Sequence, residues 1–335
     1  MSARWSAAKL KRNCISVKMM ARRNYKLGGE AAVPLLMQHH PVFRSFPTYS
    51  GPVEAGYCAH DFLGIKTRAE FLGLPPEPAR HVETGYPPLD EEYFEWIDLL
   101  ESVAAAKGTY TMMELGAGYG RWAVRGAIAI RLYRQIPFRL VVVEAEPRHF
   151  KWIERHMSEN GIDPREHTLL RAAVGDRAGT KMFYVGQPDG GDDQAAAWYG
   201  QALIQSHEIV DKAAGVDYEG YDVLKLKSGY QAIKTECLLL GDIMKDADRI
   251  DLIDMDLQGE ELKVVASTID DLDRKALRLH IGTHQPAIEA CLRKLLNKHG
   301  WECRADYACL EEHETPWGLV KFQDGVQSWI NPRLA

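Results

Sequence analysis

The sequence predicts an α/β protein built on a doubly wound, mostly parallel sheet. Short apolar runs that end in an acid or a glycine alternate with segments whose apolar residues recur at helical spacing. The runs at 109–115, 139–144 and 250–255 are apolar without alternation. Such runs are expected where helices cover both faces of a parallel sheet. Strands that alternate with helices indicate crossover units within one sheet.

Composition sets the broad class. A chain of 335 residues exceeds a usual single domain, so we expect one α/β domain with an extension. A hydrophobic fraction of 46% and a net charge of -6 describe an ordinary globular protein without a strong nucleic-acid signal. The six cysteines include no Cys-x-x-Cys pair, which favours free thiols and a cytoplasmic location. We expect neither a secretory signal nor a membrane-spanning segment.

Residues 1–107 are expected to form a basic arm and an N-terminal extension packed on the core. Residues 1–29 hold eight basic side chains and no acidic one, which suits weak contacts with anionic partners or membranes. The alternative is a solvated, partly helical tail. Residues 30–90 are predicted to be loops and short helices, and residues 90–106 an amphipathic helix.

Residues 108–335 are predicted to form the core domain, with an insertion at 186–235. The first strand should be followed by a helix at 121–134, a strand at 139–144, a helix at 147–160, a strand at 167–174 and an antiparallel strand at 181–185. The insertion is polar and aromatic, and we expect a lid in which Trp198 and Tyr199 contact the acceptor. Beyond it we expect strands at 237–240, 250–255 and 276–283, helices at 260–268 and 286–298, and a final antiparallel pair of 301–307 with 319–322.

A glycine-rich turn follows the first strand. Glycine is needed where the backbone approaches a ligand closely or takes a positive φ, and the helix N-terminus that follows offers free N–H groups. A dinucleotide-binding turn would need a third glycine at position 121, but this chain has Arg121, which disfavours a nicotinamide oxidoreductase. The residues expected to contact a cofactor here are Glu114, Gly116, Ala117, Gly118, Tyr119 and Gly120.

Acidic residues also end the later strands, where open α/β sheets bind ligands. Glu144 ends the second strand and can accept both hydroxyls of a ribose, whereas Glu146 suits a surface position near a helix N-terminus. Glu114 either orients the glycine turn or faces the amino group of a cofactor. The remaining residues expected beside an adenosine-type cofactor are Ala145, Ala173, Asp176 and Asp254.

A second cluster of acids follows the strand at 250–255. Asp254, Asp256 and Glu261, together with His284 at the next strand end, can hold a divalent cation. Alternatively, His284 is a general base that a carboxylate orients. The two interpretations differ in whether a metal is needed. The other histidines considered, which are expected to be structural or exposed, are His39, His40, His280 and His313.

Together these segments resemble the FkbM-type methyltransferases, class I enzymes that depend on S-adenosylmethionine (SAM). The resemblance covers roughly residues 108–310, and its motifs are ELGAGYG at 114–120, VVVEAEP at 141–147, RAAVGDRAG at 171–179, IDLIDMDLQGEE at 250–261 and LHIGTHQPAIE at 279–289. It implies a seven-stranded sheet, SAM as cofactor, and methylation of hydroxyl groups on sugars, polyketides and related natural products. It also implies that Asp256, Gln258, Gly259 and Glu261 occupy a family motif, in which many members have Glu where this chain has Gln258.

We therefore expect a SAM-dependent O-methyltransferase that acts on a small hydroxylated acceptor. His284 is the expected general base, Asp256 and Glu261 assist it, and Gln258 contacts the acceptor with the two aromatic residues of the insertion. The alternative enzyme is a methyltransferase acting on nucleic acid or protein. For DNA, an Asp/Asn-Pro-Pro-Tyr turn would be expected where this chain has Asp254-Met-Asp256-Leu. A non-catalytic SAM-binding scaffold is disfavoured by the intact acid–histidine cluster.

Overall fold

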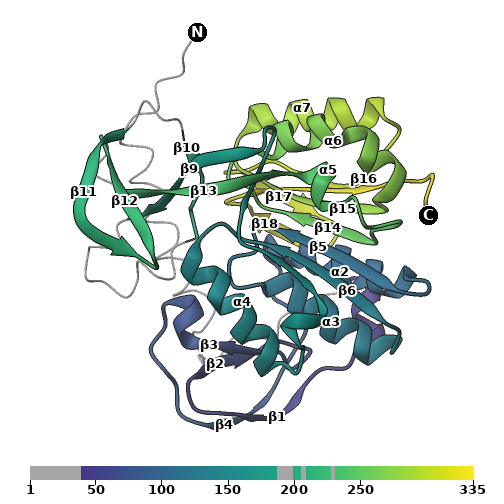
Figure 1. Ribbon diagram of the computed structural model, residues 1–335. Coiled ribbons are helices and arrows are strands. Elements are labelled where there is room, and N and C mark those ends of the chain that lie inside the picture. Colours follow the sequence, from purple (N-terminus) through teal and green to yellow (C-terminus); the bar gives the residue numbers. More distant parts are fainter. Residues whose placement is uncertain (1–38, 187–198, 205–208, 228–230) are drawn as a thin grey trace.

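A computed structural model describes residues 39–186, 199–204, 209–227 and 231–335, so the basic arm 1–29 and Trp198 lie outside the described residues. Its centre is a seven-stranded sheet in the order β16-β19-β15-β14-β5-β6-β7 (Figure 1). β19 runs antiparallel to both of its neighbours, and the other strand pairs are parallel. This confirms the predicted fold class. The strands are β5 (Tyr110–Leu115), β6 (Phe138–Val143), β7 (Thr168–Leu170), β14 (Leu252–Met255), β15 (Arg278–Thr283), β16 (Glu302–Tyr307) and β19 (Gly325–Ile330).

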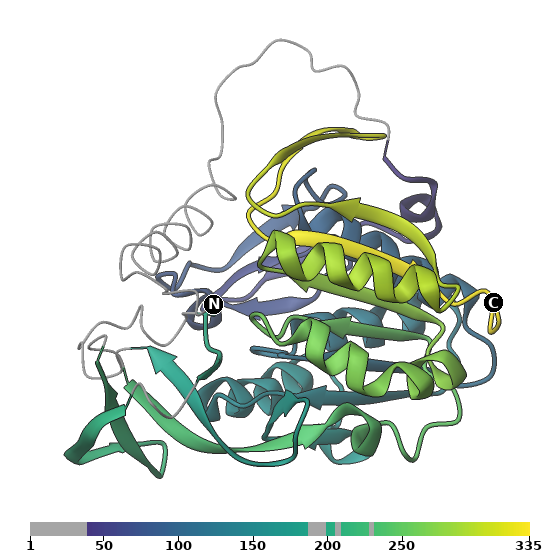
Figure 2. The same ribbon diagram turned by 90° about the horizontal axis from the view of Figure 1, so that it is seen from above.

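Helices cover both faces of this sheet, and all six side chains of β5 are buried between them. Met112 packs with the helices on one face, and Met113 and Leu115 pack with those on the other. One layer holds α2 (Glu92–Ala105), α3 (Arg121–Tyr133) and α4 (Pro147–Glu159), and the opposite layer holds α5 (Leu240–Ile243), α6 (Glu261–Lys275) and α7 (Pro286–Lys298). Figure 2 shows α6 and α7 side by side on their face.

The strand order reverses between β5 and β14. From β5 the chain continues outward to β6 and β7, whereas from β14 it continues in the other direction to β15. Open α/β sheets bind ligands beyond the carboxyl ends of the strands at such a switch point. Glu114 of β5 and Asp254 of β14 are register partners there.

A second sheet holds most of the described part of the insertion. Its strands are β8 (Ala173–Gly175), β9 (Gly179–Gly186), β10 (Leu203–Ile204), β11 (Ile209–Tyr218), β12 (Tyr221–Leu226) and β13 (Gln231–Leu239). The single strand predicted at 167–174 is therefore wrong: β7 pairs with β6 in the main sheet, whereas β8 pairs with β13. Glu219 and Gly220 join β11 to β12, and both have positive φ, as a two-residue hairpin turn requires.

The C-terminal pairing also differs from the prediction. The strand β16 pairs with β19, not with 319–322, which lies mostly in a separate hairpin of β17 (Glu312–Thr315) and β18 (Gly318–Lys321). In the described part of the chain, no helix has both the length and the apolar character needed to cross a membrane.

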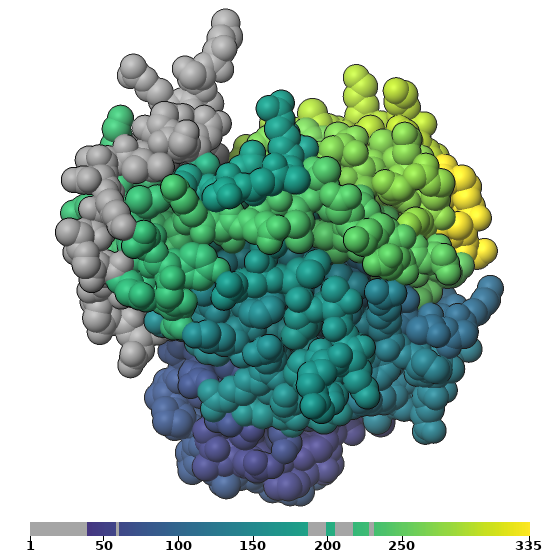
Figure 3. All heavy atoms as spheres, in the orientation of Figure 1, coloured from purple at the N-terminus to yellow at the C-terminus, as the bar shows by residue number. Residues whose placement is uncertain are grey.

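The described part of the N-terminal extension, from residue 39, contains short strand pairs in addition to the expected short helices. Its elements are η1 (Pro41–Ser45), β1 (Ser50–Val53), β2 (Tyr57–His60), β3 (Lys66–Arg68), η2 (Ala69–Leu72) and β4 (Arg80–Glu83), with β1 paired to β4 and β2 to β3. Phe43 and Phe62 belong to the same buried cluster as Trp96 of α2. The extension lies below α4 in the view of Figure 3.

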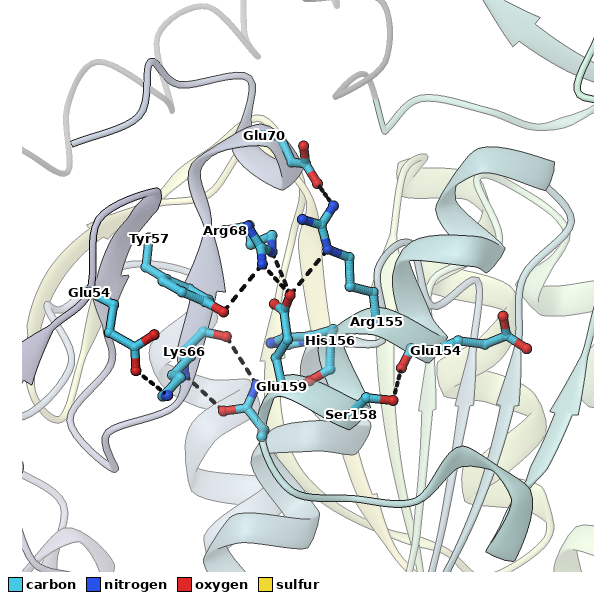
Figure 4. Close-up of polar contacts among 11 residues, drawn as sticks. Glu54, Tyr57, Lys66, Arg68, Glu70, Glu154, Arg155, His156, Ser158 and Glu159 are labelled. Atoms are coloured by element: carbon cyan, nitrogen blue, oxygen red, sulfur yellow. Dashed lines mark hydrogen bonds and ion pairs between the residues drawn. The ribbon is translucent and has the colours of Figure 1, made fainter. Parts of the chain in front are cut away.

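Polar contacts also join this extension to α4 (Figure 4). Arg68 donates to Glu159 across 2.6 Å, and the backbone N–H of Lys66 donates to Asn160 across 2.9 Å. Arg155 pairs with Glu70 at the edge of the same interface. The extension is thus fixed against the helix that begins just after Glu144.

Candidate cofactor and acceptor site

The glycine turn is shaped by contacts that only glycine permits. Gly116, Gly118 and Gly120 have φ values of 80°, 54° and 74°. A Cβ at Gly116 would lie 1.9 Å from the carbonyl oxygen of Asp256, so the turn presses directly on the segment after β14. The N–H groups of Gly116 and Ala117 both donate to Val143, at 3.0 and 3.1 Å. The turn therefore brings the ends of β5, β6 and β14 together.

Glu114 orients this turn. Its two carboxylate oxygens accept the backbone N–H groups of Trp122 and Ala123 in the first turn of α3, at 3.0 and 2.8 Å. Burial raises the pKa of Glu114 to about 8, and the neighbouring charge of Asp254 adds to this. These contacts hold the N-terminus of α3 directly after the glycine turn, and a contact of Glu114 with the amino group of a cofactor stays a prediction.

Glu144 reaches back to the glycine turn from the end of β6. One of its oxygens accepts the N–H of Gly118 at 2.6 Å, and the other accepts the N–H of Glu146 at 2.7 Å. Burial raises the pKa of Glu144 to about 8. A carboxylate has about four lone-pair sites, so each oxygen keeps capacity for a ribose hydroxyl. These residues fit an adenosine-type cofactor.

Glu146 is not the surface acid that the sequence suggested. It is 1% exposed and caps α4, accepting the N–H of His149 at 2.5 Å. Its other oxygen accepts the hydroxyl of Tyr218, from the end of β11, at 2.6 Å. This bond fastens the insertion to α4, which the local sequence gave no sign of.

The expected adenine neighbours lie at the boundary of the two sheets. Ala145 and Ala173 are buried in one cluster with Phe183, and Asp176 is exposed just after β8. Their role beside a cofactor stays a prediction.

Tyr199 lies over the glycine turn. A Cβ at Gly118 would be 2.9 Å from its ring, which stacks on His149 with centroids 4.6 Å apart and meets Tyr119 edge-on. Its hydroxyl donates to the carbonyl of Phe71 in the N-terminal extension. The insertion and the extension thus meet above the turn, a contact between distant segments that the sequence did not indicate.

The second cluster is centred on His284. Its Nδ1 lies 3.1 Å from Glu261, and its Nε2 lies 3.2 Å from Asp256 and 3.8 Å from Asp324. The Gln258 amide nitrogen lies 2.9 Å from this Nε2 and 2.8 Å from Asp256. Gln258 holds this position with a backbone φ of 51°, a region that side chains other than glycine seldom adopt. The structure thus brings together His284, Asp256, Glu261 and Gln258 and adds Asp324.

Glu261 is fully buried and fixes one side of the imidazole. Its Oε1 accepts the N–H groups of Leu257 and Gly259, at 3.2 and 2.9 Å, as well as facing His284. An acid on Nδ1 selects the tautomer whose Nε2 lone pair points away from it. The Gln258 amide nitrogen next to Nε2 matches the neutral form of that tautomer, which His284 takes above its pKa, because an amide N–H must donate to a lone pair.

The charges around His284 favour its protonated form. Burial lowers its pKa, but the charge and hydrogen bond of Asp256 and the bond to Glu261 outweigh burial and raise it well above its usual range. In turn, the imidazolium outweighs burial at Asp256 and lowers the pKa of that carboxyl. His284 therefore accepts a proton readily and acts as a base only above its raised pKa.

Asp254 also has neighbours on α2 and β15. Its carboxyl hydrogen-bonds that of Glu95 on α2, and ligand atoms of these two residues and His280 lie within 4.8 Å of one another. His280 is buried, and its Nδ1 lies 2.7 Å from Asp98. Sequence reasoning missed Glu95. A signal was available: Glu91, Glu95, Asp98 and Ser102 recur at helical spacing and mark a polar stripe on α2.

No family model matches the chain. A protein of Jannaschia sp. (strain CCS1) named as a methyltransferase is 23% identical over 266 residues, which cover 78% of this chain and 88% of that protein.

Two solved structures are similar to part of this chain. The precorrin-6y C5,15-methyltransferase of Geobacter metallireducens GS-15 is 11% identical, with a TM-score of 0.35 over 70% of this chain and 85% of that one. The methyltransferase FkbM of Methylobacillus flagellatus KT is 12% identical, with a TM-score of 0.38 over 68% of this chain and 45% of that one. The sequence relative supports the methyltransferase class.

Proposed function

We propose that this protein transfers a methyl group from SAM to a hydroxyl group of a small molecule, a sugar, a polyketide or a related natural product. The observation that carries the proposal is the oriented imidazole of His284 at the strand end next to β14. Glu261 holds its Nδ1, and its Nε2 faces a half-exposed Asp256. The acceptor class follows from the resemblance of the motifs to FkbM-type enzymes.

The chemistry of the chain's own groups fits this reaction. Bound SAM supplies an electrophilic methyl group on a positively charged sulfur. An alcohol is a weak nucleophile until its proton leaves, and the Nε2 of His284 takes that proton. The amide nitrogen of Gln258 lies in front of Nε2. In the reaction the hydroxyl of the acceptor takes this position and donates to Nε2. Asp256 stabilises the imidazolium that forms, 3.2 Å away.

Glu144 and the glycine turn are the proposed cofactor contacts, and Tyr199 is the proposed cover. A dry site favours a reaction in which charge is neutralised. We assign the acid–histidine cluster to base catalysis, because His284 has a carboxylate on each ring nitrogen. A divalent cation is the alternative: ligand atoms of Asp256, Glu261 and His284 lie within 4.8 Å of one another, and the buried Oε2 of Glu261 has no hydrogen-bond partner among the described residues.

The test is His284→Ala, assayed by formation of S-adenosylhomocysteine against a panel of sugars and polyols, with and without a chelator. We expect turnover to fall at least about 100-fold, SAM affinity to stay unchanged by calorimetry, and the chelator to have no effect. Loss of wild-type activity on chelation would establish the metal alternative. Turnover on RNA or protein but on no hydroxylated small molecule would overturn the acceptor assignment, and SAM binding without turnover on any acceptor would establish a scaffold.

A further inference from the structure

A row of polar side chains crosses the main sheet beneath α2 and α3. Glu114, Asp254, His280 and Ser328 are register neighbours on β5, β14, β15 and β19, so all four point to the same face. Most of the row has complementary partners: Glu114 binds N–H groups of α3, and His280 and Ser328 both bind Asp98. Asp254 instead meets another acid, Glu95.

Two carboxyl groups in contact need a proton or a cation between them. Burial raises the pKa of Asp254 to about 6. Burial and the charge of Asp254 together raise the pKa of Glu95 well above its usual range. His280 offsets the pair only in part: its charge lowers the pKa of Asp254, but its Nδ1 is bonded to Asp98, which adds a third carboxyl group to this cluster. The pair therefore keeps a shared proton that a cationic ligand group can replace.

We propose that Glu95 and Asp254 bind the α-ammonium group of the methyl donor. The inference rests on the proposed function only in taking SAM as the cofactor. The ammonium is favoured over the sulfonium because it keeps its charge throughout the reaction. An acid pair on the sulfonium would stabilise the ground state more than the transition state. Glu114 is the weaker candidate for this role, because each of its oxygens already accepts an N–H group of α3.

A cationic side chain that can bind the α-carboxylate of the donor lies nearby. Arg121 is the first residue of α3, directly after the glycine turn, and its charge acts on Glu95. One of its outer nitrogens binds Glu92, whereas its buried Nε has no hydrogen-bond partner among the described residues. An arginine guanidinium suits a carboxylate. Glu95 with Asp254 on one side and Arg121 on the other thus match the zwitterion of an amino acid.

The experiment compares S-adenosylhomocysteine with its deamino analogue by calorimetric titration. Neither ligand has a sulfonium, so the ammonium is the only difference. We expect Glu95→Gln to weaken S-adenosylhomocysteine about 10- to 100-fold and to leave the analogue unchanged. Glu101→Gln is the matched control, because Glu101 lies on the same helix but binds Arg278 at 2.8 Å. Wild-type preference for the ammonium ligand should grow as pH rises, because the shared proton, which the raised pKa of Glu95 retains, must leave.

Equal weakening of both ligands by Glu95→Gln, or equal wild-type affinity for both, would overturn the inference. Thermal unfolding shows whether the variant is folded. If it is not, Asp254→Asn gives the same comparison, with the same outcomes decisive. Wild-type protein that binds neither ligand would overturn the inference together with the cofactor assignment. A protein that shows the expected ligand discrimination but methylates no hydroxylated acceptor would refute the proposed reaction and leave this inference standing.

Discussion

The pKa of His284 is the quantity that most directly tests the arrangement around it. The Nε2 of His284 lies 3.2 Å from Asp256, whose side chain is 53% exposed. At the dielectric constant of water, two unit charges at that distance attract by about 1.3 kcal/mol, which is about one pH unit. Asp256→Asn should therefore lower the pKa of His284 by at least about one unit. Titration of the imidazole C–H signals by NMR measures this without cofactor or acceptor, with His284→Gln for assignment.

The raised pKa of His284 also determines how the stability of the folded protein changes with pH. A raised histidine pKa stabilises the folded protein below the unfolded-state pKa, and this contribution is lost as pH rises through the folded-state pKa. Asp256→Asn should then cost more unfolding free energy at pH 5.5 than at pH 9. Asp270→Asn removes a carboxylate about 13 Å along α6 from Glu261, beyond the screening length in physiological salt. This control should change neither the pKa of His284 nor the pH dependence of stability. A wild-type pKa at or below 6.5, or an unchanged pKa in Asp256→Asn, would refute the reasoning.

Four further substitutions test other parts of the structure. Gly116→Ala should lose at least about 2 kcal/mol of unfolding free energy, because its Cβ would collide with a backbone carbonyl at a φ of 80°; a stability equal to that of Gly85→Ala, which has open space, would contradict this. Phe71→Ala, at a fully buried ring, should cost about 3–5 kcal/mol in denaturant unfolding. Arg155→Ala, in an exposed ion pair, should cost less than about 1 kcal/mol. If Phe71→Ala and Arg155→Ala cost similar unfolding free energies, the extension is not held by its apolar contacts. Glu261→Gln should reduce turnover about 10²- to 10⁴-fold with unchanged affinity for S-adenosylhomocysteine; unaltered turnover would exclude Glu261 from orienting the base.

Local pattern was sufficient for the centre of the fold. Apolar runs without alternation located β5, β6 and β14, and Pro147 and Pro286 located the starts of α4 and α7. Long-range pairing was harder. The break between β7 and β8 depends on which strand each half meets, and β13, the partner of β8, lies more than fifty residues later in the chain. No local property of residues 167–174 carries that information.

The same limit applies to the site. Acids at strand ends were predictable because parallel strands present their carboxyl ends together. Glu114 binds a helix N-terminus, and Asp254 contacts a residue on another helix, Glu95; neither contact was predicted from the sequence. The contact of Tyr199 with Phe71 joins segments 128 positions apart. Such contacts follow from tertiary packing, which spacing along the chain does not encode.

The reversal of strand order has a consequence for synthesis of the chain. β5 finds its partner β6 soon after both are made, but Met112 of β5 pairs with Leu252 of β14, 140 positions later. At translation rates of about 5–20 residues per second, one edge of the most buried strand waits roughly 7–28 s for its neighbour. An open apolar strand edge is a template for pairing with other chains. The nascent chain is therefore most exposed to misassembly while residues 116–252 emerge, and chaperones that shield strand edges would act in that interval.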